Sequence, residues 1–357
     1  MKKILVVYGG AKNKGGIYTY LLELFTQLNK SKSFTLDLAS IGEWPLSQEL
    51  RRNGVKVIVF KKSLKGLSAG AKALRDYDLV VTMGLVSNFF GRIWGLRNRI
   101  PVLTVVHSDW RTDYENDLFK KISYFVSDRV LRFATKKYVC VSKYLEKTLI
   151  SEGIDSGRIE VVYNGVNLNV VANDQCSSKS RVIIGTIGRL HIVKNYDNLI
   201  KAFSVLCVDR DITLEIAGEG GERKHLERLI LELKLDGKVK LLGQQENIKE
   251  CFSRWSVYVQ PSLSEGFGLA VVEAMASGLP VAVSPRGALT ELVKSGETGV
   301  VMRGTTSQDI KEAINLLVSD KIFSSQCAKS GQILVREMFN VRSWAQKMEK
   351  IFVENLK

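Results

Sequence analysis

The chain has 357 residues, of which 45% are hydrophobic and 25% are charged, and its formal net charge at pH 7 is +15. This is the composition of an ordinary globular protein, and the length exceeds that at which a single hydrophobic core usually stops growing, so two domains are expected. No run of apolar residues reaches the length of a transmembrane helix. Residues 1–8 carry the charge of a signal peptide, but their apolar run is short and ends in Gly9-Gly10, so they are predicted to form a first buried strand.

The positive charge is concentrated in the first half of the chain. Residues 1–166 contain 27 Lys and Arg against 15 Asp and Glu, whereas residues 167–357 contain 25 against 22. Charge alone leaves three partners open, namely nucleic acid, an anionic membrane surface and a pyrophosphate-bearing acceptor. Solvated surface lysines without any partner are the simplest alternative.

Short apolar runs alternate with amphipathic segments along the chain. The first series of strands is predicted at Ile4–Tyr8, Phe34–Leu38, Val55–Phe60, Leu79–Thr82, Val102–His107 and Tyr138–Val141. The second series is predicted at Val182–Ile187, Thr213–Ala217, Val239–Leu242, Val257–Gln260, Val281–Ser284 and Val300–Met302. This alternation predicts an α/β protein with doubly wound parallel sheets. The polar stretch Asn164–Ser180 separates the two series and is the predicted linker.

The cysteines and histidines do not suggest a metal site. The five cysteines, Cys140, Cys176, Cys207, Cys251 and Cys327, are odd in number and have no close pairs, which favours buried, unreactive thiols in a reducing compartment over disulfides or zinc ligands. The three histidines, His107, His191 and His225, are far apart in the sequence.

The stretch Pro261–Pro280 carries two carboxylates eight positions apart across a predicted loop-to-helix turn. Pro261-Ser262 ends a strand, Glu265 lies on the following loop, and a helix is predicted from Leu269 to Ser277 with Gly278 as its C-terminal cap. Gly266 and Gly268 remove side chains where the helix begins, so the backbone N–H groups of the first turn can meet an anion. Glu273 can point to the same mouth as Glu265. Without further support, such a loop is usually an ordinary strand-to-helix connection.

This stretch resembles the signature of the retaining glycosyltransferases of family 4. The matching residues are Glu265-Gly266-Phe267-Gly268-Leu269, Glu273-Ala274-Met275-Ala276, Gly278 and Pro280-Val281. The resemblance implies the GT-B architecture, in which two Rossmann-like domains face one another across a cleft. It implies an acceptor-binding domain at residues 1–165, a nucleotide-sugar-binding domain at 166–340 and a terminal helix at 341–357 that crosses back to the first domain. In that family Glu265 would face the donor sugar, Glu273 would hold the ribose, and the backbone of Gly266–Leu269 would line the donor site.

Other motifs gain a role only through the same resemblance. Gly9–Gly16 fits neither the dinucleotide fingerprint nor the Walker spacing, and the resemblance places Gly15 and Gly16 beside the ligand. His107, at a predicted strand end, would contact the donor sugar. Arg189 and Lys194 would neutralise the diphosphate leaving group. Gln244 and Gln245, after another strand, would abut the base.

Four further stretches are interpreted as structural or as departures from the family. Gly218-Glu219-Gly220-Gly221 is predicted to be a turn lining the nucleotide pocket, and Gly287-Ala288 replaces the usual Gly-Gly pair of the family. Asp76-Tyr77-Asp78 and Asp209-Arg210-Asp211 match the D-x-D metal motif of the other glycosyltransferase fold, but each leads into a strand, so both are interpreted as strand-entry residues. We expect no metal and no cofactor.

The segment Leu118–Tyr138 is predicted to be a basic amphipathic helix. It interleaves Phe119, Ile122, Phe125, Val126, Val130 and Phe133 with Lys120, Lys121, Arg129, Arg132, Lys136 and Lys137. Two interpretations remain open, a helix packed on its own sheet and a surface that contacts an anionic membrane.

The resemblance implies a retaining, metal-independent glycosyltransferase. It would move a hexose or N-acetylhexosamine from a nucleotide-diphosphate sugar, with a UDP-sugar preferred, to a saccharide acceptor. A lipid-diphosphate-linked acceptor in the synthesis of lipopolysaccharide or capsule is expected, with the protein in the cytoplasm or at the inner face of the membrane, and no nucleic-acid partner. The alternatives are a nucleotide-sugar epimerase of the same fold and a non-catalytic protein that binds an anionic ligand. Because pure binding does not need cations at the leaving group, Arg189 and Lys194 argue against the last alternative.

Overall fold

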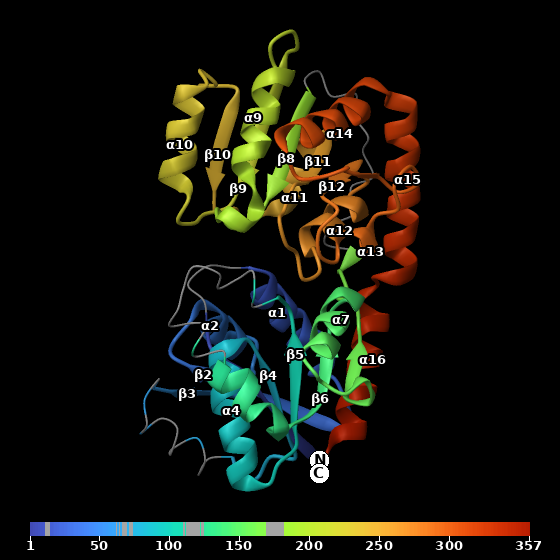
Figure 1. Ribbon diagram of the computed structural model, residues 1–357. Helices are drawn as coiled ribbons and strands as arrows, with labels where there is room; N and C mark the ends of the chain where they lie inside the picture. The colour runs from blue at the N-terminus through green and yellow to red at the C-terminus, as the bar shows by residue number, and fades with distance from the viewer. Residues whose placement is uncertain are drawn as a thin grey trace. The chain divides into compact units, whose positions relative to one another are not determined.

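The computed structural model describes residues 1–10, 15–61, 63, 65, 70, 74–109, 111, 122, 125–168 and 182–357. The chain divides into two compact units (Figure 1). Unit 1 comprises Met1–Gly165 together with Val341–Lys357, and unit 2 comprises Val166–Asn340. Most of the predicted linker, including Cys176, lies outside the described residues.

Unit 1 is built on a seven-stranded sheet within the described residues, and the strand pairs are all parallel. Its strands are β1 (Lys2–Tyr8), β2 (Phe34–Ile41), β3 (Val57–Phe60), β4 (Leu79–Met83), β5 (Val102–Val106), β6 (Thr135–Cys140) and β7 (Ile159–Val161). The order β3-β2-β1-β4-β5-β6-β7 places β1 between β2 and β4, so the direction of winding reverses there. Its helices include α1 (Gly16–Leu28), α2 (Pro45–Arg52), α4 (Leu85–Asn98), α7 (Lys143–Ser151) and α16 (Val341–Asn355).

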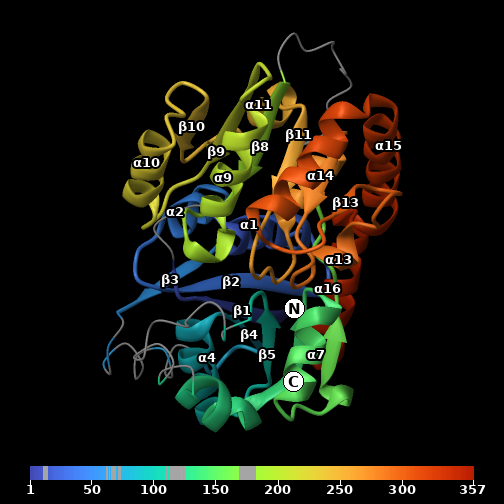
Figure 2. The same ribbon diagram turned by 45° about the horizontal axis from the view of Figure 1, so that its top comes forward.

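Unit 2 repeats the doubly wound pattern with a six-stranded parallel sheet in the described residues, in the order β10-β9-β8-β11-β12-β13. Its strands are β8 (Val182–Ile187), β9 (Ile212–Ala217), β10 (Val239–Gly243), β11 (Val257–Gln260), β12 (Val281–Val283) and β13 (Val300–Val301). Its helices include α9 (Tyr196–Leu206), α10 (Arg223–Glu232), α11 (Ile248–Arg254), α12 (Leu269–Ala276), α13 (Leu289–Leu292), α14 (Ser307–Ser319) and α15 (Lys321–Met338). Helices α9 and α14 pack side by side (Figure 2). The reversal of winding falls between β8 and β11.

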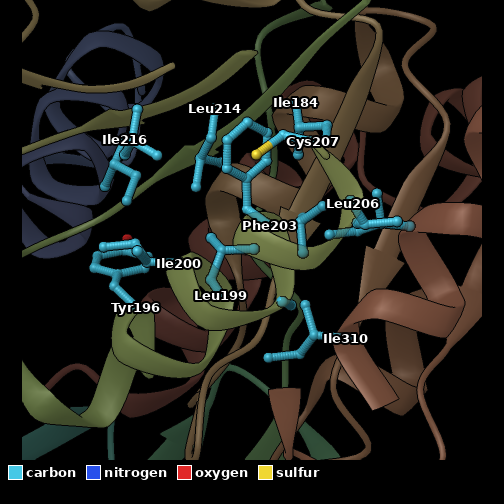
Figure 3. Packing of buried hydrophobic residues seen from close by; sticks show 14 of the residues in the cluster. Ile184, Tyr196, Leu199, Ile200, Phe203, Leu206, Cys207, Leu214, Ile216 and Ile310 are labelled. Carbon is cyan, nitrogen blue, oxygen red and sulfur yellow. The ribbon is translucent and has the colours of Figure 1, made fainter. Parts of the chain in front are cut away.

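Helix α9 shows how the apolar spacing builds the core of unit 2. Tyr196, Leu199, Ile200 and Phe203 follow the i, i+3, i+4, i+7 spacing of one helix face, and each is at most 2% exposed. They belong to one cluster with sheet residues such as Leu214 (Figure 3). Burying each of these side chains stabilises the fold by about 1.5–3 kcal/mol. The opposite face of the helix carries Val205, which is 58% exposed.

The C-terminal helix α16 packs in unit 1. Trp344, Met348 and Phe352 are at most 3% exposed. The Trp344 ring meets Tyr20 of α1 edge to face, with the ring centroids 5.2 Å apart, and Phe352 meets Phe34 of β2 at 6.0 Å. The apolar spacing of the helix is therefore accounted for by core packing.

All twelve predicted strands are present, whereas three local predictions need correction. Strand β5 ends at Val106, one residue before His107. The short strand β7, which pairs with β6, was not predicted. The predicted helix Leu118–Tyr138 is wrong at its end, where Phe125–Val130 is π-helical, Leu131–Ala134 is a 3-10 turn and Thr135–Cys140 is strand β6. Pairing of β6 with β5 outweighs the helical periodicity there. Residues 118–121, 123 and 124 of that segment lie outside the described residues.

Burial determines the chemical state of the cysteines that the structure describes. Cys140, Cys207, Cys251 and Cys327, the cysteines among the described residues, are buried and unpaired with one another. Burial raises the pKa of the Cys140 thiol to about 12, which leaves it protonated and unreactive at neutral pH. Over the part of the chain that the structure describes, no helix has the length and apolar character that a bilayer span requires.

Candidate functional site

The candidate site lies in unit 2, where the winding of the sheet reverses. Strands β8 and β11 are neighbours, and in open parallel sheets ligands bind beyond the carboxyl ends of the strands at such a point. The chain leaves β8 into residues 188–194 and leaves β11 into residues 261–268. The Leu263 N–H donates to the Val193 carbonyl across a distance of 2.8 Å, which ties the two loops together. Arg189, Lys194 and Glu265 therefore share one edge of the sheet.

Lys194 and Glu265 form an ion pair at this edge. The Nζ atom of Lys194 lies 2.6 Å from Oε2 of Glu265, and the two side chains are 21% and 18% exposed. The Ser262 hydroxyl donates to the same Oε2 atom at 3.2 Å. Among the described residues no hydrogen bond or ion pair reaches Oε1. A lysine ammonium carries three protons, so Lys194 can still donate to an anion while it contacts Glu265.

The start of helix α12 offers unpaired backbone donors. Gly268 has φ +103°, a conformation that favours glycine, and its carbonyl accepts from the N–H groups of Val271 and Val272. The N–H groups of Leu269 and Ala270 have no acceptor among the described residues, and no side chain caps the helix. Together with the helix dipole, these N–H groups favour an anion at this end of α12.

Glu273, in the second turn of α12, is partly exposed, and its side-chain carboxyl has no hydrogen-bond or ion-pair partner among the described residues. Burial raises the pKa of its carboxyl from the usual 4.5 to about 7. A carboxylate that the fold leaves without donors in a poorly solvated place is typical of a ligand-binding group.

Arg189 is exposed and has no ion-pair partner in the part of the chain that the structure describes. The backbone on both sides of it is held to the loop after β9. The Gly188 N–H donates to the Ala217 carbonyl at 3.0 Å, and the Leu190 N–H donates to the Glu219 carbonyl at 3.0 Å. A permanent positive charge is thus presented from a fixed loop at the sheet edge.

The other residues of unit 2 that the sequence analysis predicted for the donor site differ in their exposure. The Phe267 side chain is 3% exposed and its ring meets Phe339 edge to face at 5.8 Å, so this side chain belongs to the core of unit 2. Gln244 is exposed after β10, whereas Gln245 donates through Nε2 to the Leu242 carbonyl at 2.8 Å.

The loop after β12 supports Glu265 from the other side. The Ala288 N–H donates to the Glu265 carbonyl at 2.9 Å. Gly287 has φ +61°, and a Cβ atom there would lie 2.2 Å from that carbonyl oxygen, so only glycine fits. The Gly-Ala pair in place of Gly-Gly therefore keeps this backbone contact. Sequence reasoning missed Ser262 and Ala288 as neighbours of Glu265, although Ser262 stands in the Pro-Ser pair that ends the strand.

The other predicted site residues belong to unit 1. Gly15 and Gly16 are exposed, Gly15 is the N-cap of α1, and nothing lies within 4 Å of where its Cβ would be. His107 directly follows β5 and meets the Tyr20 ring edge to face, with centroids 4.4 Å apart. Burial lowers the pKa of His107 to about 4, so its imidazole is neutral at pH 7. Its Nε2 atom is buried without a partner among the described residues.

A small cavity of about 70 Å³ lies beside His107 in unit 1. Its lining includes Gly84 and Asn88 at the start of α4 and Ser108 after β5. The Asn88 side chain donates to Asp128 at 3.0 Å, and the fully buried Arg92 pairs with the same carboxylate at 2.5 Å. The cavity thus combines apolar walls with a fixed polar network.

Neither D-x-D motif forms part of this arrangement. Asp78 pairs with Lys2 at 2.9 Å and accepts from the Lys3 N–H, which fixes the start of β1. Asp211 precedes β9. Over the described ranges, no group of three or more His, Cys, Asp or Glu side chains is arranged to hold a metal ion.

Two family models match successive parts of the chain. The model "Glycosyltransferase Family 4" matches residues 15–170, and the model "Glycosyl transferases group 1" matches residues 173–333. Between them they leave only the two ends of the chain and residues 171–172 unmatched.

Curated relatives and solved structures agree with these matches. An uncharacterized glycosyltransferase of Methanocaldococcus jannaschii is 28% identical over 77% of this chain and 74% of its own length. A Bacillus subtilis protein named "Putative glycosyltransferase EpsF" is 28% identical over 87% of this chain and 85% of its own length. The crystal structure of Anabaena HepE in complex with UDP-glucose superposes with a TM-score of 0.89 at 21% identity, covering 99% of this chain and all of that chain. At that identity the likeness shows the shared fold.

Proposed function

Because this chain is a glycosyltransferase of the GT-B superfamily, we propose that it transfers a hexosyl or N-acetylhexosaminyl group from a UDP-sugar to a saccharide acceptor with retention of configuration. The proposal is supported most directly by the residues at the sheet edge of unit 2 that follow strands β8 and β11. The loops after these strands and the start of α12 carry an ammonium and, with respect to the described residues, a guanidinium without an ion-pair partner, helix N–H groups without acceptors and a carboxyl without a donor.

The cations and N–H groups suit a diphosphate leaving group. Arg189, Lys194 and the first-turn amides of α12 place positive charge where negative charge develops when the sugar–phosphate bond breaks. Fixed donors of this kind supply the largest part of many rate enhancements. The HepE structure, whose bound ligand is UDP-glucose, supports this choice of donor.

The two carboxylates suit the two hydroxyl-bearing parts of the donor. Glu273 would accept hydrogen bonds from the ribose, which would supply the partners that the fold withholds. Glu265 would accept from the sugar, and the backbone of Gly266–Leu269 would line that part of the site. In unit 1, the neutral His107 would orient the sugar, and Gly15 and Gly16 would leave room for the phosphates. Gln244 and Gln245 would lie against the base.

The proposed reaction needs no covalent enzyme intermediate. The acceptor hydroxyl oxygen attacks the anomeric carbon from the face that the diphosphate leaves, the bond to the phosphate oxygen breaks, and that oxygen takes the hydroxyl proton. Glu265 is not assigned as a nucleophile, because in this scheme its carboxylate, held on one oxygen by Lys194 and Ser262, orients the sugar and the acceptor hydroxyl attacks directly.

Unit 1 is proposed to bind the acceptor. Its basic surface suits a lipid-diphosphate-linked saccharide of a surface-polysaccharide pathway. Phe125, Val130 and Phe133 are more than half exposed, and Lys136 beside them is also exposed. An apolar surface flanked by cations is typical of contact with an anionic membrane at the inner face of the cell envelope.

A donor panel tests the proposal. The protein is incubated with UDP-, GDP- and dTDP-sugars, and ligand-observed NMR follows binding and the slow release of nucleotide diphosphate. Saturable binding of a UDP-sugar that is lost in Glu273→Ala and Arg189→Ala supports the proposal. The matched controls Glu232→Ala and Arg336→Ala change exposed residues of unit 2 that lie outside the proposed site, and they should bind as the wild type does. No binding of any donor by folded protein contradicts the proposal.

Vesicle flotation tests the membrane contact separately. We expect binding to anionic but not to zwitterionic vesicles, with a loss at high salt. The Phe133→Ser change should weaken it. Ile322→Ser, which alters a 75% exposed apolar residue of unit 2, is the control. Equal binding by both variants contradicts the assignment of this surface.

A further inference from the structure

A chain of buried polar side chains leads along strand β11 to Glu265. The Tyr258 hydroxyl donates to Oε1 of Gln260 at 2.5 Å, and Nε2 of Gln260 donates to Oγ of Ser262 at 2.7 Å. Ser262 in turn donates to Oε2 of Glu265 at 3.2 Å. Tyr258, Gln260 and Ser262 are at most 2% exposed, and their spacing of two residues is that of side chains on one face of a strand.

The chemistry of these groups fixes the direction of the chain. Burial raises the pKa of Tyr258 well above its usual value, so the phenol keeps the proton that it donates. The carbonyl oxygen of the Gln260 amide receives that proton, and its nitrogen must then face Ser262. Since the Ser262 oxygen accepts from this amide, its single proton is available to the Glu265 carboxylate.

Burying such a chain of polar side chains in the middle of a sheet costs desolvation free energy. The alternate residues Val257 and Val259 of the same strand are apolar and at most 2% exposed. An apolar side chain at position 260 would avoid the desolvation of a carboxamide, which costs several kcal/mol unless every hydrogen bond is made. Completely satisfied networks make an arrangement rigid, and they recur where a side chain must be held in one orientation.

In the resulting orientation, the two oxygens of the Glu265 carboxylate differ in their hydrogen-bond partners. Oε2 accepts hydrogen bonds from Nζ of Lys194, at 2.6 Å, and from the Ser262 hydroxyl, whereas Oε1 has no hydrogen-bond or ion-pair partner among the described residues. We infer that Tyr258, Gln260 and Ser262 are positioning residues that hold the Glu265 carboxylate so that Oε1 is presented to a hydroxyl group of the donor sugar. This inference rests on the proposed function, and it adds the oxygen that meets the sugar and the residues that aim it.

The test compares the affinities for UDP and for UDP-sugars by titration calorimetry. Because Glu265 would touch the sugar and not the nucleotide, we follow the ratio of the two dissociation constants. The probes are UDP, UDP-glucose, UDP-galactose and UDP-N-acetylglucosamine. For the UDP-sugar that the wild type binds, Ser262→Ala should raise the ratio of the UDP-sugar dissociation constant to the UDP dissociation constant about tenfold, which corresponds to about 1.4 kcal/mol. Gln260→Met should raise it less, because the Ser262 hydroxyl remains.

Ser284→Ala is the matched control. The Ser284 hydroxyl is also fully buried and donates to the backbone carbonyl of Ser262 at 2.5 Å, so its removal costs a similar hydrogen bond beside the same loop. It does not touch the Glu265 carboxylate, and the ratio should stay within about twofold of the wild type. Thermal unfolding shows that each variant is folded.

The outcomes separate the two proposals. If the wild type prefers a UDP-sugar and Ser262→Ala keeps that preference, or Ser284→Ala loses it equally, the positioning role is refuted while the proposed function stands. If the folded wild type binds neither UDP nor any of the UDP-sugars, the proposed function and this inference both fail.

Discussion

Replacing Glu273 by glutamine should make the protein more stable at alkaline pH while it weakens nucleotide binding. Burial raises the pKa of this carboxyl from 4.5 to about 7. Between those two values the folded state binds more protons than the unfolded state, so the free energy of unfolding falls as the pH rises through this window and levels off above it. Glutamine keeps the shape of the side chain but removes the ionisation.

The magnitude follows from the size of the shift. One pKa unit corresponds to about 1.4 kcal/mol, so the change in pKa from 4.5 to about 7 sets a ceiling of about 3 kcal/mol on the stability lost at about pH 8. Glu273 is partly exposed, and solvent screening reduces the expected gain for Glu273→Gln to about 1–2 kcal/mol. At about pH 4.5 the variant and the wild type should be equally stable, because the carboxyl is then protonated in the folded state.

Urea unfolding at about pH 4.5 and about pH 8, followed by far-UV circular dichroism, measures this difference. Glu232→Gln makes the same chemical change on an exposed side chain of unit 2 and should alter neither value. In parallel, the affinity of the wild type for UDP should rise with pH through about 7, as the ribose hydroxyls gain an ionised acceptor, and that of Glu273→Gln should be weaker and flat. A variant that is no more stable than the wild type at the higher pH would refute the reasoning.

Three further predictions follow from other sites. Lys194→Met should weaken UDP binding at least about tenfold, and most strongly at low salt. The same change at the exposed Lys201 should leave UDP binding unaltered. Equal effects of the two changes in calorimetry would contradict the role of Lys194. Nitrogen-15 NMR should show the His107 imidazole neutral from about pH 8 to about pH 5. Because its pKa of about 4 lies below the usual 6.5, the free energy of unfolding should fall as the pH drops from about 6.5 through 4. Titration of the imidazole near pH 6.5 would contradict its burial. Phe203→Ala should cost about 3–5 kcal/mol in urea unfolding and Val205→Ala, on the exposed face of the same helix, less than about 1; similar losses would mean that α9 does not pack as described.

The architecture could be predicted largely from local sequence because its signals are local. Buried parallel strands appear as continuous apolar runs, and glycine and proline mark where they end. Gly278 after α12 is at positive φ, as its predicted position at the C-terminal cap suggested, and Gly268 before α12 is at positive φ as well. Both the loop that carries Glu265 and the helix that carries Glu273 were therefore visible in one stretch of twenty residues.

Where elements compete for the same residues, local signals were insufficient. The helical spacing before Tyr138 extended the predicted helix into Thr135–Cys140, yet pairing with β5 makes this segment a strand. Strand β7 has only three residues, too few for a period to appear, and it exists because β6 offers it an edge.

The contacts of the site belong to the tertiary structure alone. Sequence identified Lys194 and Glu265 as separate charges 71 positions apart, and only the neighbouring carboxyl ends of β8 and β11 bring them to 2.6 Å. The same holds for the burial that shifts the pKa of Glu273 and for the hydrogen bond from Ser262 to a single oxygen of Glu265. Residue types and turn chemistry act over a few positions and set which groups are available. The desolvation and distance that set their energies depend on side chains from distant parts of the chain.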